Sequence, residues 1–166
     1  ITDHHDLVFF RYIKFAAENE VDDDGIEISE EEKITVFPGL ELTLSVPPCQ
    51  ALLILDADFP EDNLEKVINL LGLNQNSPDE GKTLQTETIP SKIVDGFDSL
   101  YDVLNSNYFL SGRFIILPNL NEGGSHTLLR KGNSEQYRRM PCVGGYVDGS
   151  IYQHGKGNQN IINGYA

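Results

Sequence analysis

Three stretches of the chain carry apolar residues at the spacing of a helix face. In the first, residues 6–20, Asp6 stands in a capping position, and the apolar face consists of Phe9, Phe10, Ile13, Ala16 and Ala17. The second, residues 60–72, begins with acidic residues and ends at a glycine, and its face consists of Leu64, Val67, Ile68 and Leu71. The third has the spacing i, i+3, i+4, i+7 at Phe97, Leu100, Tyr101 and Leu104. The pattern predicts a helix at each place.

Four shorter apolar runs have the pattern of strands. Residues 34–37 and 51–55 are almost continuously apolar, as in strands covered on both faces, and 114–117 is a short run that ends at Pro118. Residues 40–46 instead alternate apolar and polar side chains, so one face of that strand is polar. Strands that alternate with helices predict an α/β fold with parallel strands, either a barrel or a doubly wound sheet. In both, polar residues at the C-terminal ends of the strands surround one site.

The connections differ in composition from these elements. Residues 22–32 are rich in Asp and Glu, and we expect a solvated loop there. Residues 74–91 are polar and rich in turn-forming residues, which predicts an exposed loop. The glycine content rises from Asn119 onward, so the C-terminal part is expected to consist mostly of loops.

Composition narrows the class of protein. The chain has 166 residues, of which 39% are hydrophobic, enough for the core of one domain. No apolar run approaches the roughly 20 residues of a membrane-spanning helix, and two cysteines make no disulfide framework, so we expect a cytoplasmic protein that spans no membrane. The formal charge of −14 argues against a broad surface that binds nucleic-acid phosphates, but it is compatible with a local basic cleft. The chain lacks an initial Met and is expected to be cut at both ends.

Two short segments combine residue types that bind metals. Residues 2–6 read Thr-Asp-His-His-Asp directly before the first helix, and imidazole with carboxylate suits Zn, Mn or Fe. Glu41 follows a Pro-Gly turn as a lone carboxylate among leucines, where burial is costly unless a cation or hydrogen-bond donors meet it. The alternatives are that Asp6 only caps the helix beside surface histidines, and that Glu41 lies on the exposed face of an alternating strand.

A second group of residues has the chemistry to contact a phosphate. Residues 121–127 contain two consecutive glycines whose backbone N–H groups can approach a phosphate, and Arg130 follows as a cation that can contact it. The remaining concentration of cations is Lys131, Arg138 and Arg139. The alternatives are a plain surface turn and an ordinary charged face. Cys49 and Cys142 are interpreted as buried, and His154 as exposed.

These segments carry a resemblance to a known family. Residues 1–6 resemble the second motif of the PHP (polymerase and histidinol phosphatase) superfamily, and residues 38–41, Pro-Gly-Leu-Glu, resemble its third motif. The chain also resembles a narrower group, the PHP domains at the N-terminus of TrlF-type ATPases, which are AAA-like and SMC-like. That resemblance rests on residues 37–44, 48–60, 112–119 and 139–149. It identifies residues 1–166 as a partial PHP-like domain.

The resemblance implies a fold and an activity. The fold is an incomplete, distorted (β/α)7 barrel with divalent metal ions (Mn, Zn, Mg or Fe) at the C-terminal ends of its strands. Related members use these ions to activate water for phosphoester hydrolysis. His4 and Glu41 match metal ligands, Asp3 matches a residue that orients the ligating histidine, and Asn119 and Arg130 would line the site. The implied partners are a phosphoester substrate, with nucleic acid among the candidates, and an ATPase domain in the same parent chain.

Departures from the superfamily pattern leave a second interpretation open. The first motif, His-x-His, and the last, Asp-x-His, are absent from the chain, so we expect the chain by itself to be inactive. Gln50 and Asn119 stand where many members have ligating histidines, and amide oxygens suit Mg or Mn better than Zn. The alternative to an enzyme is a catalytically degenerate PHP-like scaffold that senses a ligand or regulates the attached ATPase.

Overall fold

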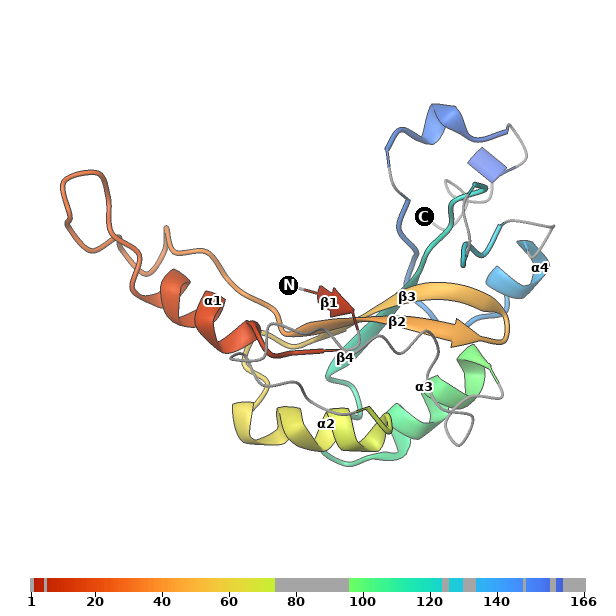
Figure 1. Cartoon of the computed structure of the whole chain (residues 1–166), viewed down its shortest axis with the longest axis horizontal. Helices are drawn as coiled ribbons and strands as arrows, with labels where there is room; N and C mark the ends of the chain where they lie inside the picture. Colours follow the sequence, from red (N-terminus) through yellow and green to blue (C-terminus); the bar gives the residue numbers. More distant parts are fainter. Residues whose placement is uncertain are drawn as a thin grey trace.

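The computed structural model describes residues 2–4, 6–73, 96–123, 126–129, 134–147, 149–155 and 158–159. Its centre is a four-stranded mixed sheet in which the strands lie in sequence order (Figure 1). The strands are β1 (Thr2–His4), β2 (Gly39–Ser45), β3 (Pro48–Leu55) and β4 (Phe114–Pro118). β1 runs parallel to β2, whereas β2 and β3, and β3 and β4, are antiparallel.

The arrangement of the strands corrects the predicted barrel. The described strands form an open sheet with mostly antiparallel pairing, not an incomplete (β/α)7 barrel of parallel strands. The physical reason lies at Val46 and Pro47, the two residues that connect β2 to β3. Two residues suffice for a hairpin, but a parallel crossover needs about a dozen or more. The apolar pattern gave the positions of these strands correctly and their direction wrongly.

One predicted strand is absent from the structure. Residues 34–37 form irregular chain before β2, and the side chains of Ile34 and Phe37 are exposed there. Their apolar character therefore does not reflect burial on both faces of a sheet. By contrast, the predicted runs 40–46, 51–55 and 114–117 correspond to β2, β3 and β4, each with slightly different ends.

The three predicted helices are confirmed, the first two with shorter bounds. They are α1 (Phe10–Glu18), α2 (Leu64–Leu70), which is preceded by the 3-10 turn η1 (Glu61–Asn63), and α3 (Phe97–Ser106). Two further short helical segments are α4 (Ser134–Tyr137) and η4 (Ile151–Gln153). Asp6 is buried and its carboxylate accepts the N–H groups of Leu7 and Val8 at 2.7 and 3.0 Å. It thus organises the turn before α1 and does not cap the helix itself.

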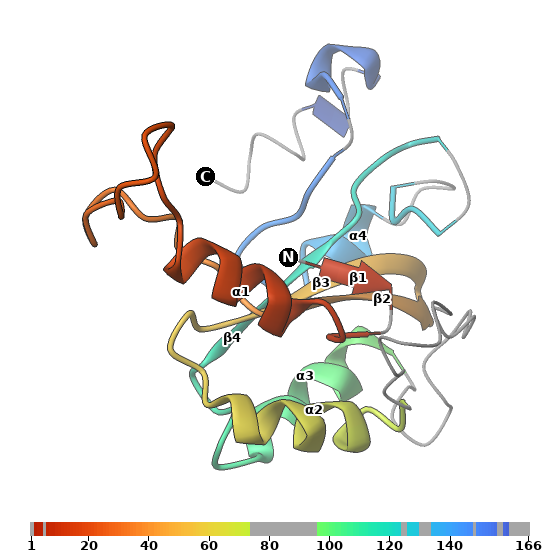
Figure 2. The same ribbon diagram turned by 60° about the vertical axis from the view of Figure 1, so that its left-hand side comes forward.

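The hydrophobic core lies between one face of the sheet and the pair α2 and α3 (Figures 1 and 2). The alternating leucines of β2 are fully buried on this face, and the helices contribute residues at helical spacing. The main core residues are Leu40, Leu42, Leu44, Cys49, Ala51, Leu53, Leu55, Leu64, Val67, Ile68, Leu71, Phe97, Leu100 and Leu104. The polar residues of β2 consequently point to the opposite face.

A close backbone approach extends the sheet beyond β4. Asn119 and Tyr146 form a parallel bridge, in which the Leu120 N–H donates to the Tyr146 carbonyl at 2.8 Å and the Tyr146 N–H donates to the Pro118 carbonyl at 3.0 Å. Gly145 permits this approach, since a Cβ there would lie 2.6 Å from the Leu120 side chain and 2.8 Å from the Pro118 oxygen. The glycine-rich C-terminal part is thereby attached to the sheet edge.

The described helices are all too short or too polar to cross a membrane. The predicted loop 74–91 lies outside the described residues.

We predict that Leu42→Ala lowers the free energy of unfolding by about 2–5 kcal/mol, because it opens a cavity under a side chain with 0% exposure. Ile115→Ala is the matched control, since Ile115 is 39% exposed in β4 of the same sheet. Urea denaturation of the wild-type protein and both variants measures the loss in free energy of unfolding that each substitution causes. Equal losses would contradict the assignment of the core to the Leu42 face.

Candidate functional site

The sheet face opposite the core gathers the polar residues of the central strands. Glu41 and Thr43 alternate with the buried leucines of β2, so they lie on this face. Thr43 pairs with Gln50 of β3 across the antiparallel ladder, which places their side chains on the same face. Asn119 follows β4 directly opposite Gln50, and its N–H donates to the Gln50 carbonyl at 2.8 Å. The β2–β3 hairpin and the distant residue after β4 therefore bring Glu41, Thr43, Gln50 and Asn119 to one face.

The parallel ladder brings two predicted metal ligands to adjacent strands. β1 and β2 are paired so that His4 is the register partner of Glu41, and Asp3 is that of Leu40. The backbones of these register partners are direct neighbours in the sheet. The side chains of Asp3 and His4 lie outside the described residues, as does the whole of Arg130. The structure thus places the backbone of the predicted Asp-His pair beside Glu41.

The Glu41 carboxylate lacks a cationic partner in the described part of the chain. Its side chain is half-buried, and the ion pairs found among these residues involve Arg11, Lys14, Lys33, Arg113 and Arg138 with other carboxylates. Partial burial removes water from a carboxylate, and a nearby cation compensates that loss. A cation beside Glu41 would compensate this partial loss of water.

Asn119 stabilises the turn after β4, a role that its position in the sequence did not indicate. Its side chain is 4% exposed, and its Oδ1 accepts the N–H of Asn121 at 3.0 Å, which shapes the turn after β4. A carbonyl oxygen has a second lone pair, so this bond leaves one acceptor position. Gln50 is likewise integrated in the backbone network, since its N–H donates to the His126 carbonyl at 2.6 Å.

Glu122 is a polar residue that the sequence analysis did not single out. Its Oε1 accepts the N–H of Gly155 at 2.8 Å and the Nδ2 of Asn158 at 2.5 Å, and so ties the C-terminal segment to the turn after β4. His154 is 8% exposed, which corrects the expectation that it is exposed. Its Nδ1 is buried without a hydrogen-bond partner among the described residues. No local pattern signals these contacts, because they depend on the fold bringing residue 122 to residue 155.

A complete metal centre is not present in the part of the chain that the structure describes. No group of three or more His, Cys, Asp or Glu residues there is arranged to hold a metal ion. The side chains of Asp3 and His4 are not among these residues. The donor types on the polar face, a carboxylate and amide and hydroxyl oxygens, are those that Mg and Mn prefer.

The two thiols have the properties of core residues. Cys49 is fully buried in β3 and Cys142 is half-buried against the core, as the sequence analysis had in part expected. Burial raises the pKa of the Cys49 thiol from 9.0 to about 12, with a smaller contribution from Cys142. Burial also raises the pKa of Cys142 to about 11. Since the thiolate is the nucleophile, neither residue is suited to covalent catalysis at neutral pH.

Comparison with models of known protein families, with curated protein sequences and with solved structures finds no match for this chain.

We predict that both thiols react slowly with iodoacetamide at pH 8 in the native protein and rapidly in denaturant, because unfolding restores their ordinary pKa.

The raised pKa of Cys49 also makes the free energy of unfolding fall between pH 9 and 12. In that window the unfolded state loses the proton that the folded state still holds. Urea denaturation at pH 8 and pH 10 should show a smaller alkaline loss in Cys49→Ala than in wild type. Equal labelling rates in the native and denatured protein would contradict the burial.

Proposed function

We propose that the chain belongs to a PHP-type, metal-dependent phosphoesterase. The observation that supports this proposal is the register of the parallel ladder, which pairs His4 with Glu41. These are the two residues that the resemblance assigns as metal ligands. The half-buried Glu41 carboxylate, without a described cationic partner, adds an electrostatic reason for a cation at this place.

Each residue of the proposed site has a separate task. His4 and Glu41 hold a divalent cation (Mn, Zn, Mg or Fe), and Asp3 orients His4 by accepting a hydrogen bond from the N–H of its other ring nitrogen. Asn119 offers its remaining lone pair as a further oxygen donor. Arg130 binds and orients the phosphate of the substrate through its guanidinium group. A bound divalent cation supplies Lewis-acid stabilisation of the phosphoryl oxygens.

The proposed substrate is a phosphoester, with nucleic acid as the candidate that suits an attached ATPase of the TrlF type. The net charge of −14 disfavours a broad nucleic-acid surface, so contacts would be confined to a local cluster of cations. That cluster is Arg130, Lys131, Arg138 and Arg139. We place the protein in the cytoplasm, since its two cysteines are free.

A second candidate function is a catalytically degenerate scaffold that senses a ligand or regulates the ATPase. The observation that favours it is Asn119, whose buried side chain already serves the turn after β4. Gln50 stands where the resemblance leads us to expect a histidine, and amide oxygens are weak ligands for zinc. Both candidates allow a ligand to bind, so turnover of a substrate is what distinguishes the scaffold from the enzyme.

We predict that the chain binds Mn²⁺ and that His4→Ala and Glu41→Gln each weaken the binding strongly. Asp3→Asn should weaken it about tenfold or more, because loss of the group that orients a ligating histidine has an effect of that size. Isothermal titration measures the affinities. Glu65→Gln is the matched control, since Glu65 is an exposed carboxylate on α2 that lies outside the proposed site.

Hydrolysis of an aryl phosphodiester by the full-length protein with Mn²⁺ separates the two candidates. Turnover that His4→Ala and Glu41→Gln abolish supports the phosphoesterase. Mn²⁺ binding without turnover supports the scaffold. Equal Mn²⁺ affinity in wild type, His4→Ala and Glu41→Gln would refute both proposals for this site.

A further inference from the structure

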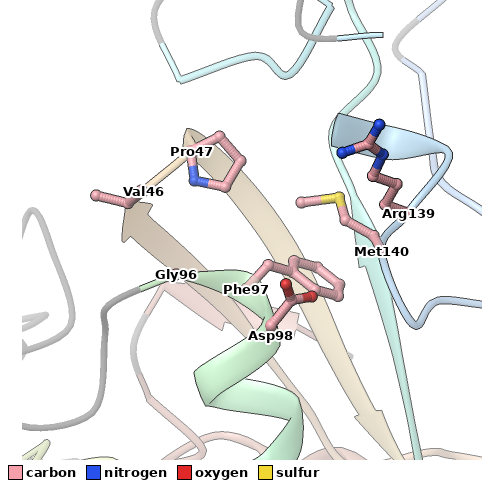
Figure 3. A pocket seen from close by; sticks show the side chains of 7 residues that line it. All are labelled: Val46, Pro47, Gly96, Phe97, Asp98, Arg139 and Met140. Atoms are coloured by element: carbon pink, nitrogen blue, oxygen red, sulfur yellow. The ribbon is translucent and has the colours of Figure 1, made fainter. Parts of the chain in front are cut away.

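A pocket of about 200 Å³ opens where three segments distant in sequence meet (Figure 3). The turn between β2 and β3 contributes Val46 and Pro47, and the start of α3 contributes Gly96, Phe97 and Asp98. The segment after α4 contributes Arg139 and Met140. The pocket lies beyond the Ser45 end of β2 and shares no residue with the proposed metal site, and Arg139 is the one residue that it has in common with the proposed cation cluster.

Contacts between the hairpin and α3 hold one side of the pocket in place. The Phe97 N–H donates to the Val46 carbonyl at 3.1 Å. Gly96, with a φ of 150°, allows this approach, because a Cβ there would lie 2.9 Å from the same carbonyl oxygen. Phe97 and Met140 are both buried and belong to the hydrophobic core. The apolar lining is therefore anchored by the core.

The charged lining residues have opposite signs and no described ion-pair partners. Asp98 and Arg139 lie on different segments around the opening, and both are exposed (Figure 3). No ion pair among the described residues includes either of them. Arg138, directly beside Arg139, is instead paired with Glu135 at 3.2 Å and does not line the pocket. The carboxylate and the guanidinium are thus both available to a ligand.

The lining matches a small molecule that carries one positive charge, one negative charge and an apolar group. The volume lies below the roughly 300–1,000 Å³ of pockets for drug-sized ligands, so the ligand is small. We propose that the pocket binds a free α-amino acid with an aliphatic side chain. Its ammonium group pairs with Asp98 and its carboxylate with Arg139. Its side chain packs on Pro47, Phe97 and Met140.

This assignment does not rest on the proposed metal site at His4 and Glu41. It places a binding site for an amino acid at the hairpin end of the sheet, next to the start of α3. A ligand with only one of the two charges would leave either Asp98 or Arg139 without its partner. Binding should therefore depend on both charged groups of the ligand.

Ligand-observed NMR titration with L-leucine and two analogues that keep its isobutyl side chain tests the proposal. 4-Methylpentanoate lacks the ammonium group, and 3-methylbutylamine lacks the carboxylate. In the wild-type protein, L-leucine should bind about threefold or more tightly than either analogue, as expected for one exposed ion pair. Asp98→Asn should remove the advantage over 4-methylpentanoate, and Arg139→Gln should remove the advantage over the amine.

Asp102→Asn and Arg138→Gln are the matched controls, because each changes a neighbouring exposed charge outside the pocket lining. Both should keep the affinity of the wild-type protein for L-leucine. Failure of L-leucine to bind, or affinities for both analogues equal to that for L-leucine in the wild-type protein, would overturn the proposal. Unchanged selectivity in Asp98→Asn and Arg139→Gln would also overturn it. The analogue comparison needs no variant, so it remains decisive if a substitution disturbs folding.

Discussion

Burial of one face of the β2–β3 hairpin is the constraint on which the other parts of the structure depend. Leu40, Leu42 and Leu44 have no exposed surface, and they pack in one core with the apolar faces of α2 and α3. Because side chains alternate along a strand, burying these leucines directs Glu41 and Thr43 to the other face. A shift of the register by one residue would exchange the two sets, at the cost of burying a carboxylate in the core. The hydrophobic core thus also positions the polar candidate site.

Between β3 and β4 the chain forms both core helices. Arg113, directly before β4, contacts residues that directly follow β3. Its guanidinium contacts Asp56 at 3.0 Å and Asp58 at 2.7 Å, and it lies 5.3 Å from the centre of the Phe59 ring. The Asp56 N–H also donates to the Arg113 carbonyl at 3.1 Å. These contacts are partly exposed, so each contributes little energy compared with the core. The register of β4 against β3, which places Asn119 opposite Gln50, is held by the antiparallel ladder between the two strands.

The two proposed sites differ in how they are held. The polar face with Glu41 lies on hydrogen-bonded strands, which fix its backbone positions closely. The pocket beside Phe97 is formed by the hairpin turn, the start of α3 and the segment after α4. Phe97 and Met140 belong to the core, and the hairpin turn is held by the hydrogen bond from Phe97 to Val46. Its two exposed charges supply selectivity, whereas its apolar lining supplies the contact area.

The local sequence determined the helices and most of the strands, because their apolar spacing is a property of neighbouring residues. It also indicated that Glu41 is a carboxylate on the polar face of an alternating strand. Strand direction, the pairing of His4 with Glu41, the turn made by Asn119 and the burial of His154 were decided by the tertiary structure. The same holds for the meeting of Asp98 and Arg139 around one pocket. The Asn119 turn and the β2–β3 hairpin are local, whereas the other features depend on contacts between segments far apart in the chain. An alternating pattern is the same whichever strand lies beside it, and whether the two strands are parallel or antiparallel.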